Sequence, residues 1–378
     1  MSSNLQNIPF LDFSAMHASI RGEMMEAFES VYDSYWYILG KYLQRFEEEY
    51  AAFNKTKYAV GVSNGLDALI LALKALEIGP GDEVIVPSNT YIATVLAVSH
   101  VGATPVFVEP DIATYNIDPH RIPEAITART KAIMPVHLYG QACEMNTIMQ
   151  IAKEHGLWIV EDNAQAHGAT FKGRVTGSWG HINGTSFYPG KNLGAIGDAG
   201  AITTDDEDLA RKVRLLRNYG SEVKYKNEVI GYNMRLDELQ AALLSVKLRH
   251  LKHWTTQRQQ IAAWYSEALA GVGDLILPAC HPDATHVYHL YVVRTKYRDT
   301  LQQYLKNAGI GTLIHYPIAP HMQKAYAQLG FKKGDFPVSE ELANIILSLP
   351  MWVGMNQFVV ENVCEKIHIF YDGIIKSA

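Results

Sequence analysis

The stretch SFYPGKNLGAIGDAGAI (186–202) places one lysine, Lys191, among glycines and apolar residues. Lysine side chains normally lie on the surface, where water solvates the ammonium group. Here Gly190 and Gly194 bend the backbone on either side, and phenylalanine, proline, leucine and isoleucine stand close by. Desolvation disfavours the charged form of an amine, so the nitrogen becomes a better nucleophile toward a carbonyl or an aldehyde. A lysine in a surface loop is the common alternative, so the rest of the chain must decide between them.

Two further motifs could hold a phosphorylated ring cofactor near this lysine. The segment SNGLDAL (63–69) passes from a strand into a helix that opens at a glycine, and unpaired N–H groups at a helix start bind phosphate. The segment VEDNAQAHG (160–168) places Asp162 at the end of an apolar strand, where an unpaired carboxylate is costly. A protonated pyridine nitrogen would satisfy this carboxylate, and Gln165 could reach a ring hydroxyl on the same side. Taken alone, glycine turns are common and Asp162 could equally cap a helix.

Two more segments carry residues of a matching type. In PSNTYIAT (87–94), Tyr91 could stack on a flat ring, or could be an ordinary core or surface aromatic residue. In GYNMRLDELQAA (231–242), Asn233 could reach a phosphate, or could cap the helix that follows. Together with Lys191, these motifs supply the parts that a pyridoxal-phosphate site needs. The glycine fingerprint of dinucleotide-binding proteins is absent, which disfavours a dehydrogenase.

Strands and helices alternate along most of the chain, which predicts a mainly parallel sheet with helices on both faces. In such sheets ligands bind beyond the carboxyl ends of the strands. We expect strands at 58–64, 83–87, 105–110, 131–139, 157–162 and 199–204, and helices at 18–53, 65–78, 91–100, 119–128, 145–155 and 208–220. A long helix from Arg235 toward Leu269 leads to a smaller α+β domain with a strand at 289–295. We therefore expect a large cofactor-binding domain at 1–250 and a small C-terminal domain at 251–378.

Composition excludes several classes of protein. The chain has 378 residues, of which 48% are hydrophobic and 19% charged, with a net charge of −6. No basic face is evident, which argues against binding to nucleic acid or anionic membranes. The N-terminus lacks the pattern of a signal peptide, and no apolar run is long enough to span a membrane. Three distant cysteines indicate a reducing, cytoplasmic compartment, and their spacing predicts no metal site.

These motifs resemble, nearly end to end, the DegT/DnrJ/EryC1/StrS sugar aminotransferases, which share the aspartate-aminotransferase fold (pyridoxal-phosphate fold type I). The lysine segment and the Asp-x-x-Gln segment are the most specific. The segments that carry the resemblance are IPFLDF, SNGLDALILAL, GDEVIVPSNTYIAT, PVHLYGQ, IVEDNAQAHGA, SFYPGKNLGAIGDAGA, GYNMRLDELQAALL and GTLIHYPIAPHMQ. Some relatives have histidine in place of the lysine and act as dehydratases, but this chain keeps Lys191.

The resemblance assigns a role to each candidate residue. It implies that Lys191 binds pyridoxal 5′-phosphate covalently and that Asp162 faces the pyridine nitrogen. It further implies that Gln165 lies near the ring hydroxyl and that Tyr91 stacks on the ring. The phosphate would be bound by the backbone of Gly65 and Leu66 and by the hydroxyl of Ser186. Asn233 would come from a partner subunit, so the resemblance implies a homodimer with shared active sites.

The resemblance also indicates the substrates. The segment FYPGKNLGAIGDAG is similar to that of the subgroup acting on 3-keto nucleotide sugars, with L-glutamate as donor and a dTDP-3-amino-3,6-dideoxyhexose as product. Candidates to bind the sugar nucleotide are Tyr188, His315 and Tyr316, with Lys224 and Tyr225 of the partner on the diphosphate. His315 could equally be a hydrogen-bonded core residue. The alternatives are a 4-keto sugar aminotransferase of the same fold and a non-catalytic pyridoxal-phosphate-binding regulator. His181 stands where many relatives have aspartate, and we expect only local hydrogen bonding to change.

Overall fold

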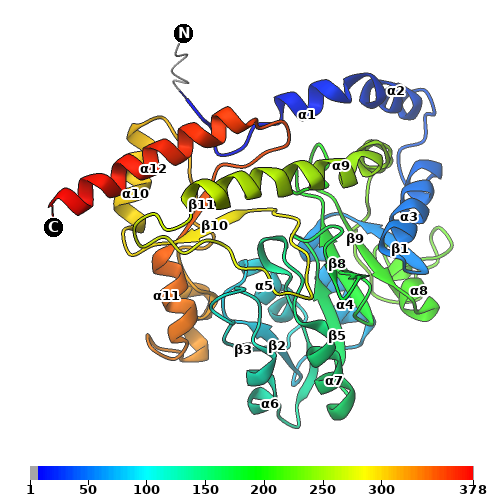
Figure 1. Cartoon of the computed structure of the whole chain (residues 1–378). Coiled ribbons are helices and arrows are strands. Elements are labelled where there is room, and N and C mark those ends of the chain that lie inside the picture. The colour runs from blue at the N-terminus through cyan, green and yellow to red at the C-terminus, as the bar shows by residue number, and fades with distance from the viewer. Residues whose placement is uncertain (1–6, 378) are drawn as a thin grey trace.

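The structure, a computed structural model, describes residues 7–377 and is built around a seven-stranded sheet (Figure 1). Its strand order is β1-β9-β8-β5-β4-β2-β3, in which β9 runs antiparallel to both of its neighbours and the other pairs are parallel. The strands are β1 (Tyr58–Val62), β2 (Glu83–Pro87), β3 (Thr104–Val108), β4 (Thr130–Ile133), β5 (Trp158–Asp162), β8 (Ile182–Ser186) and β9 (Gly200–Thr204). The mainly parallel sheet expected from the sequence is therefore confirmed.

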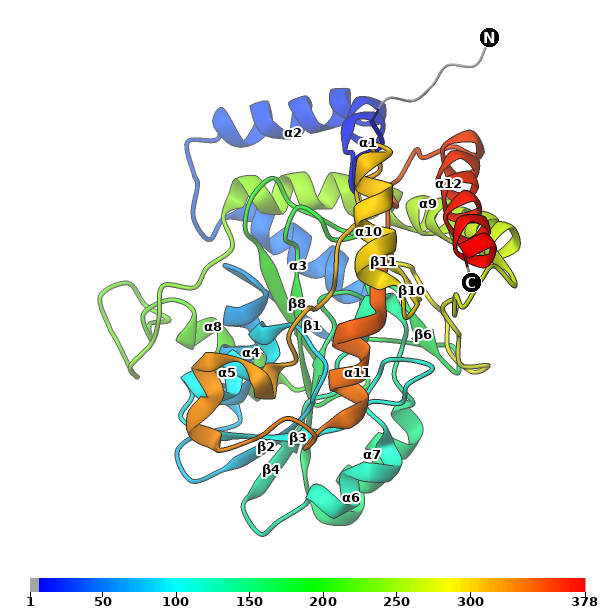
Figure 2. The same cartoon turned by 90° about the vertical axis from the view of Figure 1, so that its left-hand side faces the viewer.

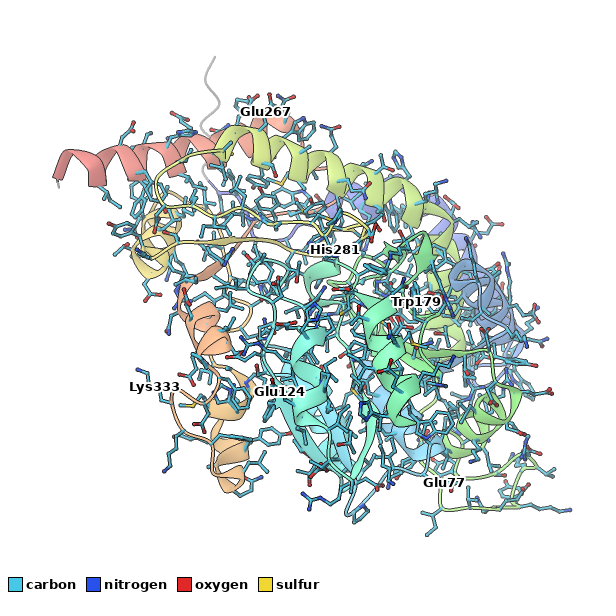
Figure 3. The ribbon with its side chains drawn as sticks, turned by 60° about the horizontal axis from the view of Figure 1, so that its bottom comes forward. Glu77, Glu124, Trp179, Glu267, His281 and Lys333 are labelled. Atoms are coloured by element: carbon cyan, nitrogen blue, oxygen red, sulfur yellow. The ribbon has the colours of Figure 1, made fainter. Side chains whose placement is uncertain are left out.

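Helices cover both faces of this sheet because alternate strand residues point to opposite sides. In β2, Val84 and Val86 join one buried apolar cluster, whereas Ile85 joins another. The first cluster contains residues of α4 (Gly65–Ala75), α5 (Ile92–His100) and α8 (Glu207–Leu216). The second contains residues of α6 (Ile122–Ala125) and α7 (Met145–His155). The charged side chains labelled in Figure 3, such as Glu77, Glu124 and Lys333, are exposed to solvent outside these clusters.

The long helix α9 (Glu238–Leu269) crosses the top of the sheet and links it to the C-terminal part (Figures 1 and 2). Its first half packs with α3 (Lys41–Asn54) against β1 and the lysine segment, and α2 (Arg21–Tyr32) lies beside it. The short α1 (Ser14–Ser19) precedes α2.

A separate apolar cluster joins the second half of α9 to the C-terminal elements. There β10 (Tyr291–Arg294) pairs antiparallel with β11 (Ile346–Leu349) beside α10 (Arg298–Asn307) and α12 (Gln357–Ser377). The remaining elements are α11 (Pro337–Ile345), the β6–β7 hairpin (Thr170–Phe171, Arg174–Val175) and four 3-10 turns at Pro119–Arg121, Leu138–Gly140, Pro320–Met322 and Lys324–Leu329. The predicted boundary at residue 250 falls inside α9, and the division into two domains stays a prediction.

The single helix predicted for 18–53 is wrong, because the chain breaks between α2 and α3. Tyr35 and Leu39 adopt left-handed backbone angles, with φ of 53° and 51°, which no helix allows. Periodicity alone did not reveal this break, since no proline or glycine cluster precedes Gly40.

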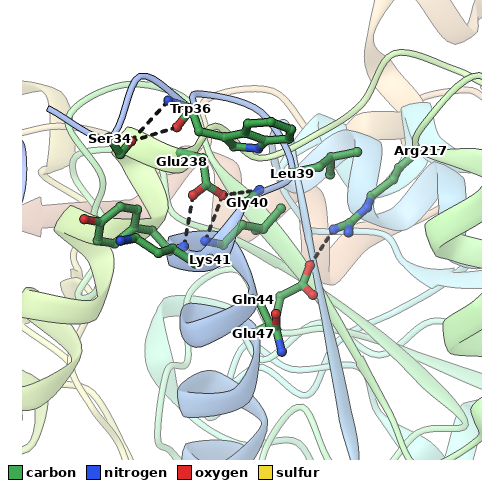
Figure 4. A pocket seen from close by; sticks show the side chains of 11 residues that line it. Ser34, Trp36, Leu39, Gly40, Lys41, Gln44, Glu47, Arg217 and Glu238 are labelled. Carbon is green, nitrogen blue, oxygen red and sulfur yellow. Dashed lines mark hydrogen bonds and ion pairs between the residues drawn. The ribbon is translucent and has the colours of Figure 1, made fainter. Parts of the chain in front are cut away.

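A carboxylate from a distant helix fixes the start of α3. Glu238, in the first turn of α9, accepts the N–H groups of Gly40 and Tyr42 at 2.8 and 2.9 Å (Figure 4). A negative charge at a helix N-terminus is favourable, because the N–H groups there lack partners within the helix. A Cβ at residue 40 would lie 2.8 Å from the Glu238 carboxylate, so only glycine fits.

Prolines shorten two other predicted elements. The helix expected over 119–128 is a 3-10 turn followed by the four-residue α6, with prolines at 119 and 123. The strand expected over 131–139 ends at Ile133, two residues before Pro135, because proline cannot donate to the ladder. Beyond it the chain turns and approaches the end of β5, where the candidate site lies.

Candidate active site

The predicted site residues gather at one edge of the sheet. Strands β1, β5 and β8 run in the same direction, so their carboxyl ends meet there, as expected for a ligand site in an α/β fold. Asp162 is the last residue of β5 and Ser186 the last of β8. The strand β9 starts at this edge, where a Cβ on Gly200 would lie 2.5 Å from the carbonyl oxygen of Asn64. The glycine turn after β1 and the end of the lysine segment are therefore in direct contact.

The start of α4 forms a cradle of hydrogen-bond donors with Ser186. Asn64 caps the helix by accepting the N–H of Asp67 at 2.9 Å, which leaves the N–H groups of Gly65 and Leu66 at the open end. A Cβ on Gly65 would lie 2.5 Å from the Cβ of Ser186, so glycine is needed for the hydroxyl to approach. Two backbone donors, a hydroxyl and the positive end of a helix dipole suit a phosphate group.

Asp162 is buried and holds its carboxylate toward the same edge. One oxygen accepts the Thr94 hydroxyl at 2.7 Å and the other accepts the N–H of Ala164 at 3.1 Å. Burial raises the pKa of Asp162, while the Thr94 hydrogen bond, the Ala164 hydrogen bond and the charge of Lys191 act in the opposite direction. The residues after Asp162 form turns, so it does not cap a helix.

Thr94 is a contact that the sequence did not reveal. It is fully buried and also lies 2.9 Å from the hydroxyl of Thr90. It stands one turn after Tyr91 in the segment quoted for that tyrosine, which was the available signal.

Gln165 is fixed by two tyrosines. Its side-chain oxygen accepts the N–H of Tyr139 at 2.7 Å, and its amide nitrogen donates to the Tyr316 hydroxyl at 3.0 Å. The ring of Tyr91 lies 5.2 Å from that of Tyr316 and is 52% exposed, so Tyr91 is not a core residue. The structure thus brings Gln165, Tyr91 and Tyr316 together, and one face of the Tyr91 side chain stays open to solvent. Tyr139 had not been predicted.

Lys191 lies in a turn, and its own backbone N–H donates to the carbonyl of Tyr188 at 2.8 Å. Desolvation lowers the pKa of its amine to about 8, although the charge of Asp162 acts to raise it. The charges of Lys191 and Asp162 therefore influence each other, which indicates that the two groups lie near each other. The lowered pKa makes the neutral, nucleophilic amine far more abundant near neutral pH than in an ordinary lysine.

Histidines close to Lys191 are uncharged. Burial and the charge of Lys191 lower the pKa of His167 to about 3 and that of His315 to about 4. His167 stacks on Phe187, with ring centroids 5.6 Å apart. His315 is partly buried and its Nδ1 lies 2.8 Å from the Ser348 hydroxyl, so both sequence interpretations of this residue keep support. His167 belongs to the motif quoted for Asp162, but its position beside Phe187 was not predicted.

The other predicted residues point outward. Tyr188 is 59% exposed at the entrance to the lysine turn, and Tyr225 is 87% exposed in a projecting loop. Lys224 lies 5.1 Å from the Tyr225 ring and makes a cation–π contact with it. Asn233 is exposed and does not cap the following helix, whose N-cap is Asp237. Tyr188 joins the site through its backbone, because its N–H donates to the Ser186 hydroxyl at 3.2 Å.

Other sequence-based expectations concern features outside this site. His181 accepts the N–H of Ile159 at 2.9 Å, so its effect is local hydrogen bonding, as expected. In residues 7–377 no group of three or more His, Cys, Asp or Glu side chains could hold a metal ion. No helix in this described part of the chain is both long and apolar enough to cross a bilayer.

Comparison with known proteins gives a consistent result. The model of the DegT/DnrJ/EryC1/StrS aminotransferase family matches residues 18–368. A curated relative, the dTDP-3-amino-3,6-dideoxy-alpha-D-galactopyranose transaminase of Aneurinibacillus thermoaerophilus, is 53% identical over 96% of this chain and 99% of its own length.

Solved structures agree with this likeness. The S. venezuelae protein DesV, solved in complex with a ketimine intermediate, superposes with a TM-score of 0.95 at 48% identity, over 97% of this chain and 99% of DesV. The Bacillus subtilis protein NtdA, solved with the bound cofactor PMP, gives a TM-score of 0.92 at 32% identity, over 98% of this chain and 86% of NtdA.

Proposed function

Because the chain belongs to the DegT/DnrJ/EryC1/StrS aminotransferase family, we propose that it moves an amino group from L-glutamate to a dTDP-linked 3-keto-6-deoxyhexose. The product is then a dTDP-3-amino-3,6-dideoxyhexose. Membership of the family confirms the expected fold type, the aminotransferase activity and pyridoxal 5′-phosphate as the cofactor. The observation that carries the proposal is the buried carboxylate of Asp162 at the carboxyl end of β5, close enough to the desolvated amine of Lys191 for their charges to interact.

The residues at the sheet edge fit this cofactor. The unpartnered N–H groups of Gly65 and Leu66 and the hydroxyl of Ser186 supply donors for its phosphate. Asp162 offers a carboxylate that would pair with the pyridinium nitrogen, and the amide of Gln165 would be available to the ring hydroxyl. Tyr91 presents an open aromatic face on which the ring can stack.

Each of these side chains then has a defined task. When bound, pyridoxal phosphate supplies an electron sink for the carbanion formed at the amino acid's α-carbon. Asp162 keeps a proton on the ring nitrogen, because a buried carboxylate stabilises a neighbouring cation. The amine of Lys191 would hold the cofactor and, when free, would take the α-proton of L-glutamate as a base. It later returns a proton to the C3 atom of the sugar.

The sugar nucleotide requires a groove above this site. We propose that the hexose contacts Tyr188, His315 and Tyr316, since Tyr316 itself contacts both Gln165 and Tyr91. The similarity to the A. thermoaerophilus transaminase supports amination at C3 and a dTDP carrier. A 4-keto sugar aminotransferase would share all the contacts described above, so only the product separates the two functions.

We further propose a homodimer in which each subunit completes the other's site. Asn233 is exposed and Lys224 and Tyr225 project from the same region, so they remain available to a partner. In this arrangement Asn233 binds the cofactor phosphate of the partner, and Lys224 with Tyr225 contacts the sugar diphosphate. A cytoplasmic location is part of the same proposal, since none of the three cysteines forms a disulfide.

Mixed dimers test the sharing of sites. Lys191→Ala and Asn233→Ala each inactivate every site in their own homodimer, but a hybrid contains one site with neither change. A refolded one-to-one mixture should therefore recover roughly a quarter of wild-type activity, because half of the dimers are hybrids with one intact site. An inactive mixture whose hybrids are detected by mass spectrometry would contradict the shared site.

The main experiment follows colour and product. The purified protein should be yellow and should bleach on adding L-glutamate, whereas a non-catalytic regulator would stay yellow. Lys191→Ala should lose both the visible absorption band of lysine-bound cofactor and turnover. NMR analysis of products from synthetic 3-keto and 4-keto dTDP sugars then decides the position of amination. Full activity in Lys191→Ala would refute the mechanism, and exclusive amination at C4 would refute the substrate.

A further inference from the structure

A second lysine lies behind the catalytic turn and is almost completely buried. Lys247 of α9 is 1% exposed, although lysine is rarely buried unless it is paired. Its ammonium group donates to the carbonyl oxygen of Gly194 at 2.7 Å and lies 3.3 Å from Nε2 of His17. Desolvation lowers its pKa to about 8, and no carboxylate in residues 7–377 offsets this cost. The free-energy cost of burying this ammonium group suggests that Lys247 serves a function that offsets it.

The carbonyl that Lys247 binds belongs to the turn that carries Lys191. A Cβ on Gly194 would lie 2.2 Å from the carbonyl oxygen of Pro189, so the two ends of the turn are in contact. The N–H of Ala195 then donates to the carbonyl of Phe187 at 2.8 Å. The ends of the turn are thus closed by the backbone, and the carbonyl of Gly194 faces α9.

Helix α9 holds this turn at a second point on the same face. Gln240, two turns before Lys247, accepts the N–H of Ile196 at 2.9 Å. Between them, Leu244 packs in one apolar cluster with Leu193 and Ala195. Lys247 provides the charged contact in this row, and a charged donor makes a stronger hydrogen bond to a carbonyl than a neutral one.

We propose that Lys247 is a positioning residue that clamps the carbonyl of Gly194 and so fixes the direction in which Lys191 projects. The inference rests on the proposed role of Lys191 as the lysine that binds the cofactor. A misplacement of about 1 Å in a reacting group can cost up to about 100-fold in rate. Loss of the clamp should therefore affect the chemical step more than substrate binding, because Lys247 lies behind the turn.

The test replaces Lys247 by methionine, which keeps the length of the side chain without its donor. Lys252→Met, at an exposed position of the same helix, is the matched control. Lys247→Met should slow the single-turnover reaction with L-glutamate by about 10- to 100-fold, with less than about twofold change in the dissociation constant for L-glutamate. The pKa of the lysine–cofactor Schiff base, read from its visible band, should move by at least about half a unit.

Two results would overturn the inference. One is a rate and a Schiff-base pKa that equal those of Lys252→Met. The other is a loss of rate without any change in the Schiff-base pKa, which indicates a general structural defect. If Lys247→Met does not fold, Lys247→Leu, which also lacks a donor, takes its place under the same criteria. An unaltered visible band in Lys191→Ala would instead overturn the proposed function itself.

Discussion

Two segments predicted to serve the same site are held in opposite ways. The lysine turn is packed inside the chain: Phe187, Leu193 and Ala195 are buried, and α9 binds its backbone at two points. The other segment, the loop after α8 (221–231), extends from the body of the molecule (Figure 2). Its Ile230 is 94% exposed and its Tyr225 87% exposed.

Two glycines close the base of the loop. A Cβ on Gly220, whose φ is 70°, would lie 1.8 Å from the carbonyl oxygen of Val229, and one on Gly231 would lie 2.0 Å from the N of Gly220. These glycines let the two legs of the loop come together, while its tip makes few contacts. Several apolar side chains of this loop are exposed, namely Val223, Tyr225, Val229 and Ile230, and the proposed partner subunit would cover them.

This difference indicates that the proposed site has two parts. The preorganised part, with Lys191 and Asp162, is fixed within one chain, and the assembled part, the loop at 221–231, would be completed by a partner subunit. The chain itself aims Lys191 and Asp162, so changes there should alter the chemical step. The loop can act only through what it reaches, so changes at its tip should alter binding and little else. Substitutions in the two parts should therefore have different kinetic effects.

The largest effect should come from Asp162→Asn in the preorganised part. Asparagine can still accept the Thr94 hydroxyl, so the fold should survive, but the charge that holds a proton on the ring nitrogen is lost. We expect kcat to fall by about 100- to 1,000-fold, the magnitude seen when one electrostatic contact to a transition state is removed. Steady-state kinetics measure this, and unchanged near-UV circular dichroism controls for folding. A kcat within tenfold of wild type would contradict the role of Asp162.

A smaller effect is expected from Gly65→Ala in the phosphate cradle. The new Cβ would lie 2.5 Å from the Cβ of Ser186, so one of the two segments must shift. We expect the affinity for pyridoxal phosphate to fall about tenfold or more, since about 1.4 kcal/mol corresponds to that factor. Equilibrium dialysis of the apoenzyme measures it. Gly22→Ala, where nothing lies within 4 Å, is the control and should leave the affinity unchanged.

The pH dependence of cofactor attachment should report the environment of Lys191. Its pKa is lowered to about 8, so the neutral amine decreases below that pH and is the dominant form above it. The rate of covalent attachment to the apoenzyme should rise about tenfold per pH unit up to about pH 8 and then level off. Stopped-flow absorbance measures this rate. A rise that continues past pH 10 would mean that the amine has an ordinary pKa and that the turn does not desolvate it.

The smallest effect is expected at the loop tip, from Lys224→Ala. Its ammonium group is exposed, and exposed charge pairs contribute about 1 kcal/mol or less. The KM for the sugar nucleotide should rise about two- to fivefold, more at low salt than at high salt, with kcat unchanged. Steady-state kinetics at two salt concentrations measure it. An unchanged KM would remove Lys224 from the site, and a large fall in kcat would remove the distinction between the two segments.

Sequence patterns located the sheet and the key motifs but not the contacts between them. The glycine turn at Gly65 looked ordinary and strand β8, which ends at Ser186, was not expected, and only folding brings the two within contact distance. The break between α2 and α3 was missed because the carboxylate that fixes it, Glu238, lies about two hundred residues away in sequence. Thr94, Tyr139 and Lys247 were missed for the same reason, since each acts through a residue distant in the chain.

The sequence by itself determined most of the strand and helix pattern, the candidate reactive lysine and the family, because local spacing and residue type carry that information. The tertiary structure decided how reactive Lys191 is, since burial lowers the pKa of its amine while the charge of Asp162 acts to raise it. It also decided which residues are buried together and which stay exposed. Desolvation and charge interactions depend on distances in space, and these exist only once the chain has folded.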